Sequence, residues 1–154
     1  MSTNEDAPPV DWLTSEEERD WRAYLRMVTA VQVRTAQDLA ELGLSEPDYE
    51  VLSTLSEHPD GTSPLHAQAA KMGWSRSRLS RHTSRMEARG LIRRDPDPSD
   101  GRGCLLTLTA TGRDTLREAA PSHVASVRRH FVDRLTPDEL TTLGRIAQKL
   151  TSES

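Results

Sequence analysis

Four arginines recur along one short stretch of the chain and could bind phosphate or the edges of nucleic-acid bases. They are Arg76, Arg78, Arg81 and Arg85. A guanidinium group is planar, always charged and rich in N–H donors, which suits phosphate oxygens and the paired acceptors of guanine. Residues 71–94 contain eight basic residues and one acidic residue, whereas the rest of the chain has 12 basic and 23 acidic residues. The overall net charge of −4 therefore conceals one strongly basic segment.

The spacing of residues 75–89 predicts an amphipathic helix, with Ser75 as its cap and Gly90 at its end. One side of its helical wheel carries Leu79, His82, Thr83 and Met86. The other side carries small or basic residues, namely Arg76, Ser77, Ser80, Arg81, Ser84 and Arg85. Serines let a helix approach a groove closely, and arginines reach phosphates or bases. The alternative interpretation is an arginine-rich helix face that is simply solvated.

The neighbouring segments predict elements that could position this helix. Ser63 is expected to cap a short helix that Gly73 ends, so that two helices are joined by a turn. Runs 91–95 and 104–108 read as strands joined by a loop rich in Pro, Gly and Asp, which indicates a hairpin. In such an arrangement the second helix enters the major groove, and Arg102 at the hairpin tip can reach the minor groove.

Longer helical patterns flank this part of the chain. Apolar residues recur at helical spacing from Trp21 to Leu42, after a capping pattern at Thr14 and the glutamates that follow it. A second helix is expected to begin at Ser45. Helical spacing returns after Thr109, and Pro121 is expected to kink or divide that segment. Thr136, Pro137 and Glu139 then predict a final helix start.

Two stretches resemble the MarR family. Residues 75–92 look like its recognition helix and first wing strand, and residues 97–112 look like its wing signature. That signature has an Asp-x-Arg pair, here Asp100 and Arg102, followed by a strand and Leu-Thr-x-x-Gly. Weaker matches preserve the helix order, so the resemblance spans roughly residues 15–150.

The resemblance implies a mainly α fold with a small β-wing. It places a winged helix-turn-helix lobe at 45–109 and a helical dimerisation region at 10–44 and 110–151, after a disordered tail at 1–9. It implies a homodimer that binds pseudo-palindromic double-stranded DNA, usually as a repressor, and is often released by a small aromatic or anionic ligand. Dimerisation also follows from physics, since two lobes related by a twofold axis reach successive major grooves.

The candidate DNA-binding residues combine the exposed helix side with the wing. By position in the family motif, Asp100 would orient the wing and Arg102 would read the minor groove, while Arg93 and Arg94 would lie near the DNA backbone. The full set is Ser75, Arg76, Ser77, Arg78, Ser80, Arg81, Ser84, Arg85, Arg94, Asp100 and Arg102.

Candidate ligand residues are the aromatic side chains Trp21, Tyr24, His58 and Trp74. The alternative is that aromatics at helical spacing form the core. The thiol-sensing members carry their reactive cysteine on the first helix, whereas the single Cys104 lies on a wing strand, which favours a structural or incidental thiol. The histidines form no metal-binding pair, so neither a metal nor a cofactor is expected.

Other classes of protein fit the sequence less well. No phosphate loop, nucleophile elbow or metal motif points to an enzyme. A protein-binding adaptor or a transcriptional activator built on the same winged helix stays open as an alternative, although an adaptor is expected to lose the arginines of the exposed helix face. One cysteine, the lack of a long apolar run and an N-terminus unlike a signal peptide indicate a cytoplasmic protein without a membrane segment.

Overall fold

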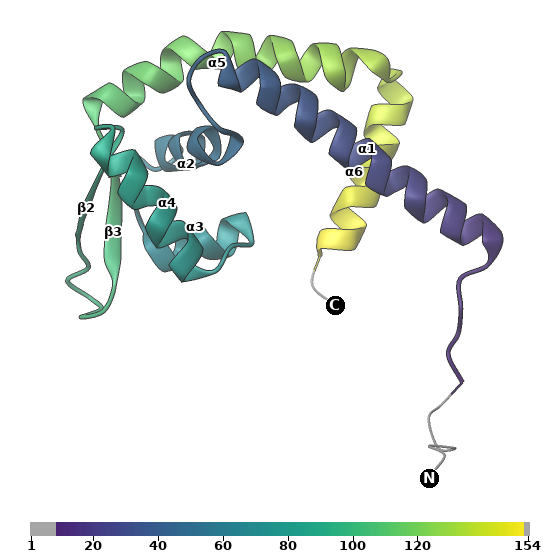
Figure 1. The fold of residues 1–154 in the computed structure, drawn as a ribbon, viewed down its shortest axis with the longest axis horizontal. Coiled ribbons are helices and arrows are strands. Elements are labelled where there is room, and N and C mark those ends of the chain that lie inside the picture. Colours follow the sequence, from purple (N-terminus) through teal and green to yellow (C-terminus); the bar gives the residue numbers. More distant parts are fainter. Residues whose placement is uncertain (1–8, 153–154) are drawn as a thin grey trace. The chain divides into compact units, whose positions relative to one another are not determined.

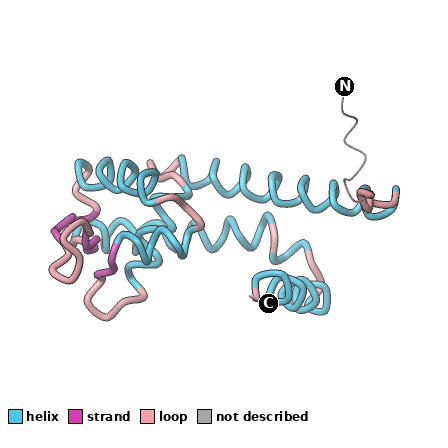
Figure 2. Tube along the Cα trace, turned by 90° about the horizontal axis from the view of Figure 1, so that it is seen from below, coloured by secondary structure: helices cyan, strands magenta, loops and turns pink. Residues whose placement is uncertain are grey.

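The computed structural model describes residues 9–152, which are mainly helical with one small sheet (Figures 1 and 2). This confirms the predicted fold class of a mainly α protein with a β-wing. The proposed disordered tail lies, apart from Pro9, outside the described residues. The elements are α1 (Ser15–Ala40), α2 (Glu46–Ser56), β1 (Thr62–Pro64), α3 (Leu65–Met72), α4 (Arg76–Ala88), β2 (Ile92–Pro96), β3 (Cys104–Leu108), α5 (Ala110–His130), a 3₁₀ turn (Val132–Arg134) and α6 (Pro137–Thr151).

The contacts divide the chain into two compact units, of which the first ends at Val33 and the second begins at Arg34. In the first unit, α1 begins with the predicted capping pattern. The Thr14 N–H donates to Glu17 Oε2 at 2.8 Å, and the Glu17 N–H donates to Thr14 Oγ1 at 3.2 Å. Trp21 and Tyr24 stack with their ring centroids 5.5 Å apart, and both rings are about half exposed. This unit therefore presents aromatic surface to its surroundings.

The second unit has a core in which α2, α4 and the sheet meet. Its fully buried side chains include Leu52 and Leu55 of α2, Leu79 and Met86 of α4, and Leu106 of β3. Each helix places apolar residues three or four positions apart on its inner side, as an amphipathic helix requires. The core therefore holds α4 by its apolar side and leaves the opposite side exposed.

The strands form one antiparallel sheet in the order β1-β3-β2. The hairpin of β2 and β3 is the predicted wing, with Arg94 opposite Leu106. The prediction that Ser63 caps a helix is wrong, because Ser63 lies buried in β1 opposite Leu106. α3 begins after Pro64, and no side chain caps the start of this helix. β1 has only three residues and pairs with β3, which is far away in the sequence. The local sequence therefore shows no recognisable strand pattern.

α5 connects the wing to the rest of the second unit. Asp38, near the end of α1, accepts hydrogen bonds from Ser126 Oγ at 2.6 Å and lies 3.1 Å from His130 Nε2, both on α5. Of the two expected effects of Pro121, a kink or a division, the division does not occur, since α5 continues through this residue. Pro121 is exposed, so the carbonyl that loses its helical partner can be hydrated. Within residues 9–152, no helix combines the length and apolar character needed to cross a bilayer.

Candidate nucleic-acid interface

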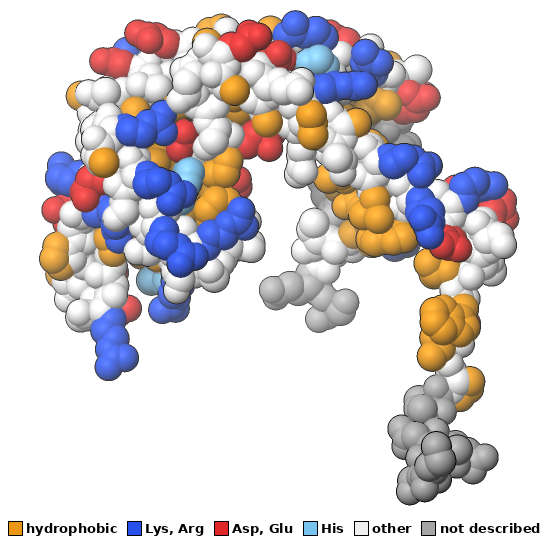
Figure 3. Space-filling model, in the orientation of Figure 1, with side chains coloured by type: hydrophobic (Ala, Val, Ile, Leu, Met, Phe, Trp, Pro, Cys, Tyr) orange, Lys and Arg blue, Asp and Glu red, His pale blue; other side chains and the backbone are white. Residues whose placement is uncertain are grey.

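The orientation of α4 agrees with its helical wheel. The Ser75 side chain accepts a hydrogen bond from the Arg78 N–H at 3.2 Å, which caps the helix start. Thr83, although polar, is fully buried and donates to the Leu79 carbonyl at 2.8 Å. On the opposite side, most of the predicted residues are exposed and Ser80 is half-buried. Basic side chains therefore gather over α4 (Figure 3), and Arg102 is exposed in the wing loop.

Neighbouring acids neutralise only part of the basic segment. Lys71 pairs with Glu57 at 3.0 Å, and Arg93 pairs with Asp95 at 2.7 Å. Arg89 pairs with Asp48 at 2.7 Å. Six arginines of α4 and the wing have a guanidinium group that forms no ion pair with an acidic side chain of residues 9–152. They are Arg76, Arg78, Arg81, Arg85, Arg94 and Arg102. Their mutual repulsion is relieved when a polyanion binds beside them.

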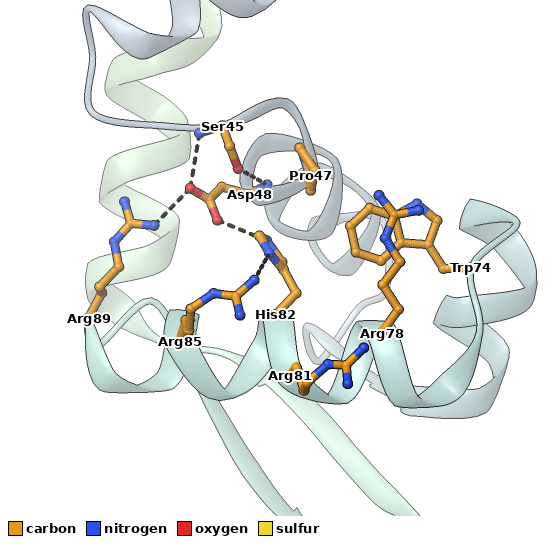
Figure 4. Close-up of a pocket in the computed structure, with 9 residues that line it drawn as sticks. All are labelled: Ser45, Pro47, Asp48, Trp74, Arg78, Arg81, His82, Arg85 and Arg89. Atoms are coloured by element: carbon orange, nitrogen blue, oxygen red, sulfur yellow. Dashed lines mark hydrogen bonds and ion pairs between the residues drawn. The ribbon is translucent and has the colours of Figure 1, made fainter.

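A hollow of about 600 Å³ opens between the start of α2 and the side of α4 (Figure 4). Arg78 lies over the ring of Trp74, with its guanidinium carbon 3.6 Å from the ring centroid. The other arginines that line the hollow are Arg81, Arg85 and Arg89. The cation–π contact holds Arg78 along the edge of the helix.

A buried carboxylate, Asp48, connects α2 to the same side of α4. Its Oδ2 accepts from the Ser45 N–H at 3.0 Å and from Arg89 Nη1 at 2.7 Å, and its Oδ1 lies 3.0 Å from His82 Nε2. Burial raises the pKa of Asp48, but these donors outweigh burial and lower its pKa well below the ordinary value. Arg89 Nη2 also donates to the Gly43 carbonyl at 2.7 Å. Asp48 therefore stays ionised and fixes α4 against the turn before α2.

The wing loop is ordered by its own aspartates. Asp97 is buried, and its Oδ1 accepts from the N–H and the hydroxyl of Ser99 at 2.9 and 2.7 Å. Asp100 Oδ1 accepts from the Arg102 N–H at 3.1 Å. The Gly103 N–H donates to the Asp100 carbonyl at 2.8 Å. These bonds shape the backbone on which the exposed Arg102 stands.

Arg94 and the four candidate ligand residues lie in different parts of the structure. Arg94 of β2 turns toward α4, where its guanidinium contacts Ser80 and Ser84. Trp21 and Tyr24 stack on α1 of the first unit. His58 is half-buried in the turn after α2 and does not line the hollow of Figure 4, whereas Trp74 does. Their role in binding a ligand stays a prediction.

Comparison with known proteins agrees with this geometry. Residues 44–104 match the profile of the MarR family. The chain is 31% identical over 130 residues to the transcriptional regulator HosA of Escherichia coli O111:H-, covering 84% of this chain and 94% of HosA. The chain belongs to the MarR family. Its members in these comparisons are transcriptional regulators, and so is this chain.

Two solved MarR-family regulators from Streptomyces coelicolor have the same fold. AbsC is 40% identical, with a TM-score of 0.84 over 94% of this chain and all of AbsC. Sco3205, solved in complex with DNA, is 36% identical, with a TM-score of 0.85 over 97% of this chain and 95% of Sco3205. The MarR fold therefore extends over nearly the whole chain.

Sequence reasoning missed the residues that hold the MarR recognition helix in place. Asp48 sits three positions after Ser45, a capping spacing that was visible in the sequence. His82 stood out as a polar residue on the inner side of the helical wheel, and Glu87 as the one acid of the basic segment. The Glu87 carboxylate accepts from the Arg94 N–H at 2.7 Å. Asp48, His82 and Glu87 thus stand out in the sequence as polar residues, but their partners lie on other elements and could not be read from it.

Proposed function

We propose that this MarR-family regulator binds double-stranded DNA in a sequence-specific manner. α4 would lie in the major groove, and Arg102 would enter the adjacent minor groove. The observation that carries this proposal is the set of arginines on α4 and the wing that lack acidic partners among residues 9–152. The DNA complex of Sco3205, a relative 36% identical, supports the same role here.

The proposed DNA contacts fall into two groups. The exposed residues of α4 and the wing would touch DNA directly, and they are Arg76, Ser77, Arg81, Ser84, Arg85 and Arg102. The remaining candidates would present or support them, since Ser75 caps α4, Arg78 lies over Trp74 and Asp100 orders the wing loop. Ser80 and Arg94 contact each other through a hydrogen bond of 3.0 Å.

We further propose that the regulator is a homodimer on a pseudo-palindromic operator. Apolar side chains stand exposed near both ends of the described chain. Trp12 before α1 is 81% exposed and Leu150 of α6 is 75% exposed, and α6 buries none of its residues. Exposed apolar side chains on each unit favour interaction surfaces, and a second copy of the chain would cover them.

Repression and release by a small effector complete the proposal, and both are carried by the family resemblance. An aromatic or anionic effector would suit surfaces that combine aromatic rings with arginines. Trp74 with Arg78 is such a surface. Binding of an anion there would compete with DNA for the same positive charge.

The substitution Arg81→Ala tests the proposed DNA interface. Affinity for the operator, measured by fluorescence anisotropy at one fixed salt concentration, is expected to fall by about 5- to 150-fold, because an arginine contact to DNA contributes about 1–3 kcal/mol. The mass measured by light scattering should stay that of a dimer. Arg117→Ala is the control, since Arg117 is an exposed arginine of α5 that pairs with Asp114. Equal affinities of wild type and Arg81→Ala would contradict the proposed orientation of α4.

A further inference from the structure

Arg94 differs from every other arginine of the basic segment in what it contacts. Its Nη2 donates to Ser80 Oγ at 3.0 Å, and its Nη1 donates to Ser84 Oγ. Both serines belong to the outer side of α4, one half-buried and one exposed. The Arg94 side chain is half-buried, and its Nε is inaccessible and without a hydrogen-bond partner. The guanidinium therefore bridges the wing strand and the recognition helix.

A second contact joins the same residue to the same helix through its backbone. The Arg94 N–H donates to Glu87 Oε2 at 2.7 Å. β2 is thereby attached to α4 near the end of the helix by Glu87 and nearer its middle by Ser80 and Ser84. The preceding residue, Arg93, is exposed on the other side of the strand and pairs with Asp95. Two adjacent arginines thus have different surroundings.

We propose that Arg94 is a positioning residue that fixes the wing against α4 and orients the hydroxyls of Ser80 and Ser84 toward DNA. This inference rests on the proposed DNA-binding function. A guanidinium group has only donors, so each serine oxygen in the bridge must accept. The hydroxyl proton of each serine is then directed away from Arg94.

The orientation of the two serine hydroxyls affects which DNA bases they can bind. A directed O–H donor matches the acceptors of the major groove, which are purine N7, guanine O6 and thymine O4, and also phosphate oxygens. An amino group of cytosine or adenine could reach only the second lone pair of the serine oxygen and would leave the hydroxyl proton without an acceptor. Opposite Ser84, which is exposed, we therefore expect the operator to present an acceptor.

The salt dependence of binding separates positioning from a direct phosphate contact. Loss of one phosphate contact lowers the slope of log affinity against log salt by about one. For Arg94→Ala we expect operator affinity to fall by about tenfold or more and the ratio of operator to non-specific affinity to fall with it. The salt slope should stay at the wild-type value. Arg117→Ala, which removes an exposed arginine of α5 outside the proposed interface, should leave both the affinity and the operator preference unchanged.

A lysine at position 94 sharpens the test, because it keeps the charge but cannot bridge two oxygens with a planar fork. Positioning predicts that Arg94→Lys fails to restore the operator preference. It also predicts that Arg94→Ala has less effect on affinity in a Ser80→Ala, Ser84→Ala background than in wild type. The coupling between Arg94 and the two serines is obtained from the DNA affinities of the variants. They are measured at a temperature at which circular dichroism shows that each variant is folded.

The opposite results would overturn the proposal. A salt slope lowered by about one in Arg94→Ala, together with rescue by lysine, would make Arg94 a direct phosphate contact. Additive effects of the arginine and serine substitutions would also exclude the bridge. Either result leaves DNA binding by the wild type intact, whereas absence of wild-type binding would overturn the proposed function itself.

Discussion

Gly112→Ala is expected to lower the free energy of unfolding by about 2–4 kcal/mol, because overpacking against fixed backbone is costly. Gly112 lies buried in the first turn of α5, where its N–H donates to Thr109 Oγ1 at 3.0 Å. A Cβ at this position would lie 2.1 Å from the Leu91 carbonyl oxygen and 2.9 Å from Leu108 Cδ1. The carbonyl belongs to the backbone and cannot rotate away. The glycine of the Leu-Thr-x-x-Gly signature is thus explained by the approach of α5 to the wing.

A second helical glycine provides the control for this prediction. Gly144 of α6 has no atom within 4 Å of the position that a Cβ would occupy. Gly144→Ala should therefore leave stability unchanged or raise it by about 0.5–1 kcal/mol through helix propensity. Both variants are unfolded with urea at the same protein concentration, since a dimer is stabilised by mass action. Equal effects of the two substitutions would contradict the packing of α5 against Leu91.

Asp48→Ala is expected to destabilise the protein by about 2–4 kcal/mol at neutral pH, from the lost helix cap and the lost charged hydrogen bonds. The carboxylate is buried and contacts Ser45, His82 and Arg89. Arg89 is partly exposed, so solvent screens its contribution to stability. The larger loss of stability comes from removing the buried Asp48 carboxylate, which contacts three groups at once. The recognition helix should lose its fixed position, and DNA affinity should fall together with stability.

Glu139→Ala is the matched control, because Glu139 occupies the same capping position in α6. Its Oε2 accepts from the Thr136 N–H at 2.9 Å, and the side chain is exposed. The control should cost only about 0.5–1 kcal/mol, the usual contribution of a cap. Equal costs of Asp48→Ala and Glu139→Ala would show that the contacts of Asp48 with α4 contribute nothing.

Acid should reduce the difference in stability between wild type and Asp48→Ala. The pKa of Asp48 is lowered in the folded protein, so its stabilisation is fully present above the pKa of the unfolded chain, about 3.9. It is lost as the pH falls through the lower pKa of the folded state. Urea unfolding between pH 7 and pH 3 should therefore show a constant difference down to about pH 5 and a shrinking one below about pH 4. A difference that grows on acidification would contradict this assignment.

The helix boundaries could be predicted because they depend on local chemistry. Ser45 and Ser75 cap their helices with their own side chains. Gly73 and Gly90 adopt positive φ at the ends of α3 and α4, a conformation that glycine adopts without steric cost. Such signals act within a few residues, so a single sequence is enough to read them.

The features that could not be predicted depend on partners far away in the chain. Ser63 reads as a helix cap until β3 is present to pair with it. The bridge from Arg94 to Ser80 and Ser84 requires knowing which side of β2 faces α4, and the alternation of Arg93 and Arg94 along a strand fits either side equally. The contact of Arg94 with α4 was therefore not foreseen, and its position near the DNA backbone stays a prediction.

A DNase footprint over the region upstream of the gene tests the central claim most directly. We expect protection of a pseudo-palindromic site whose two halves are centred about one helical turn apart, about 10–10.5 base pairs, as two recognition helices related by a twofold axis require. Protection should weaken steeply as salt is raised, because arginines displace condensed cations from the DNA. Absence of any protected site there and in a random-sequence selection at low salt would contradict the account.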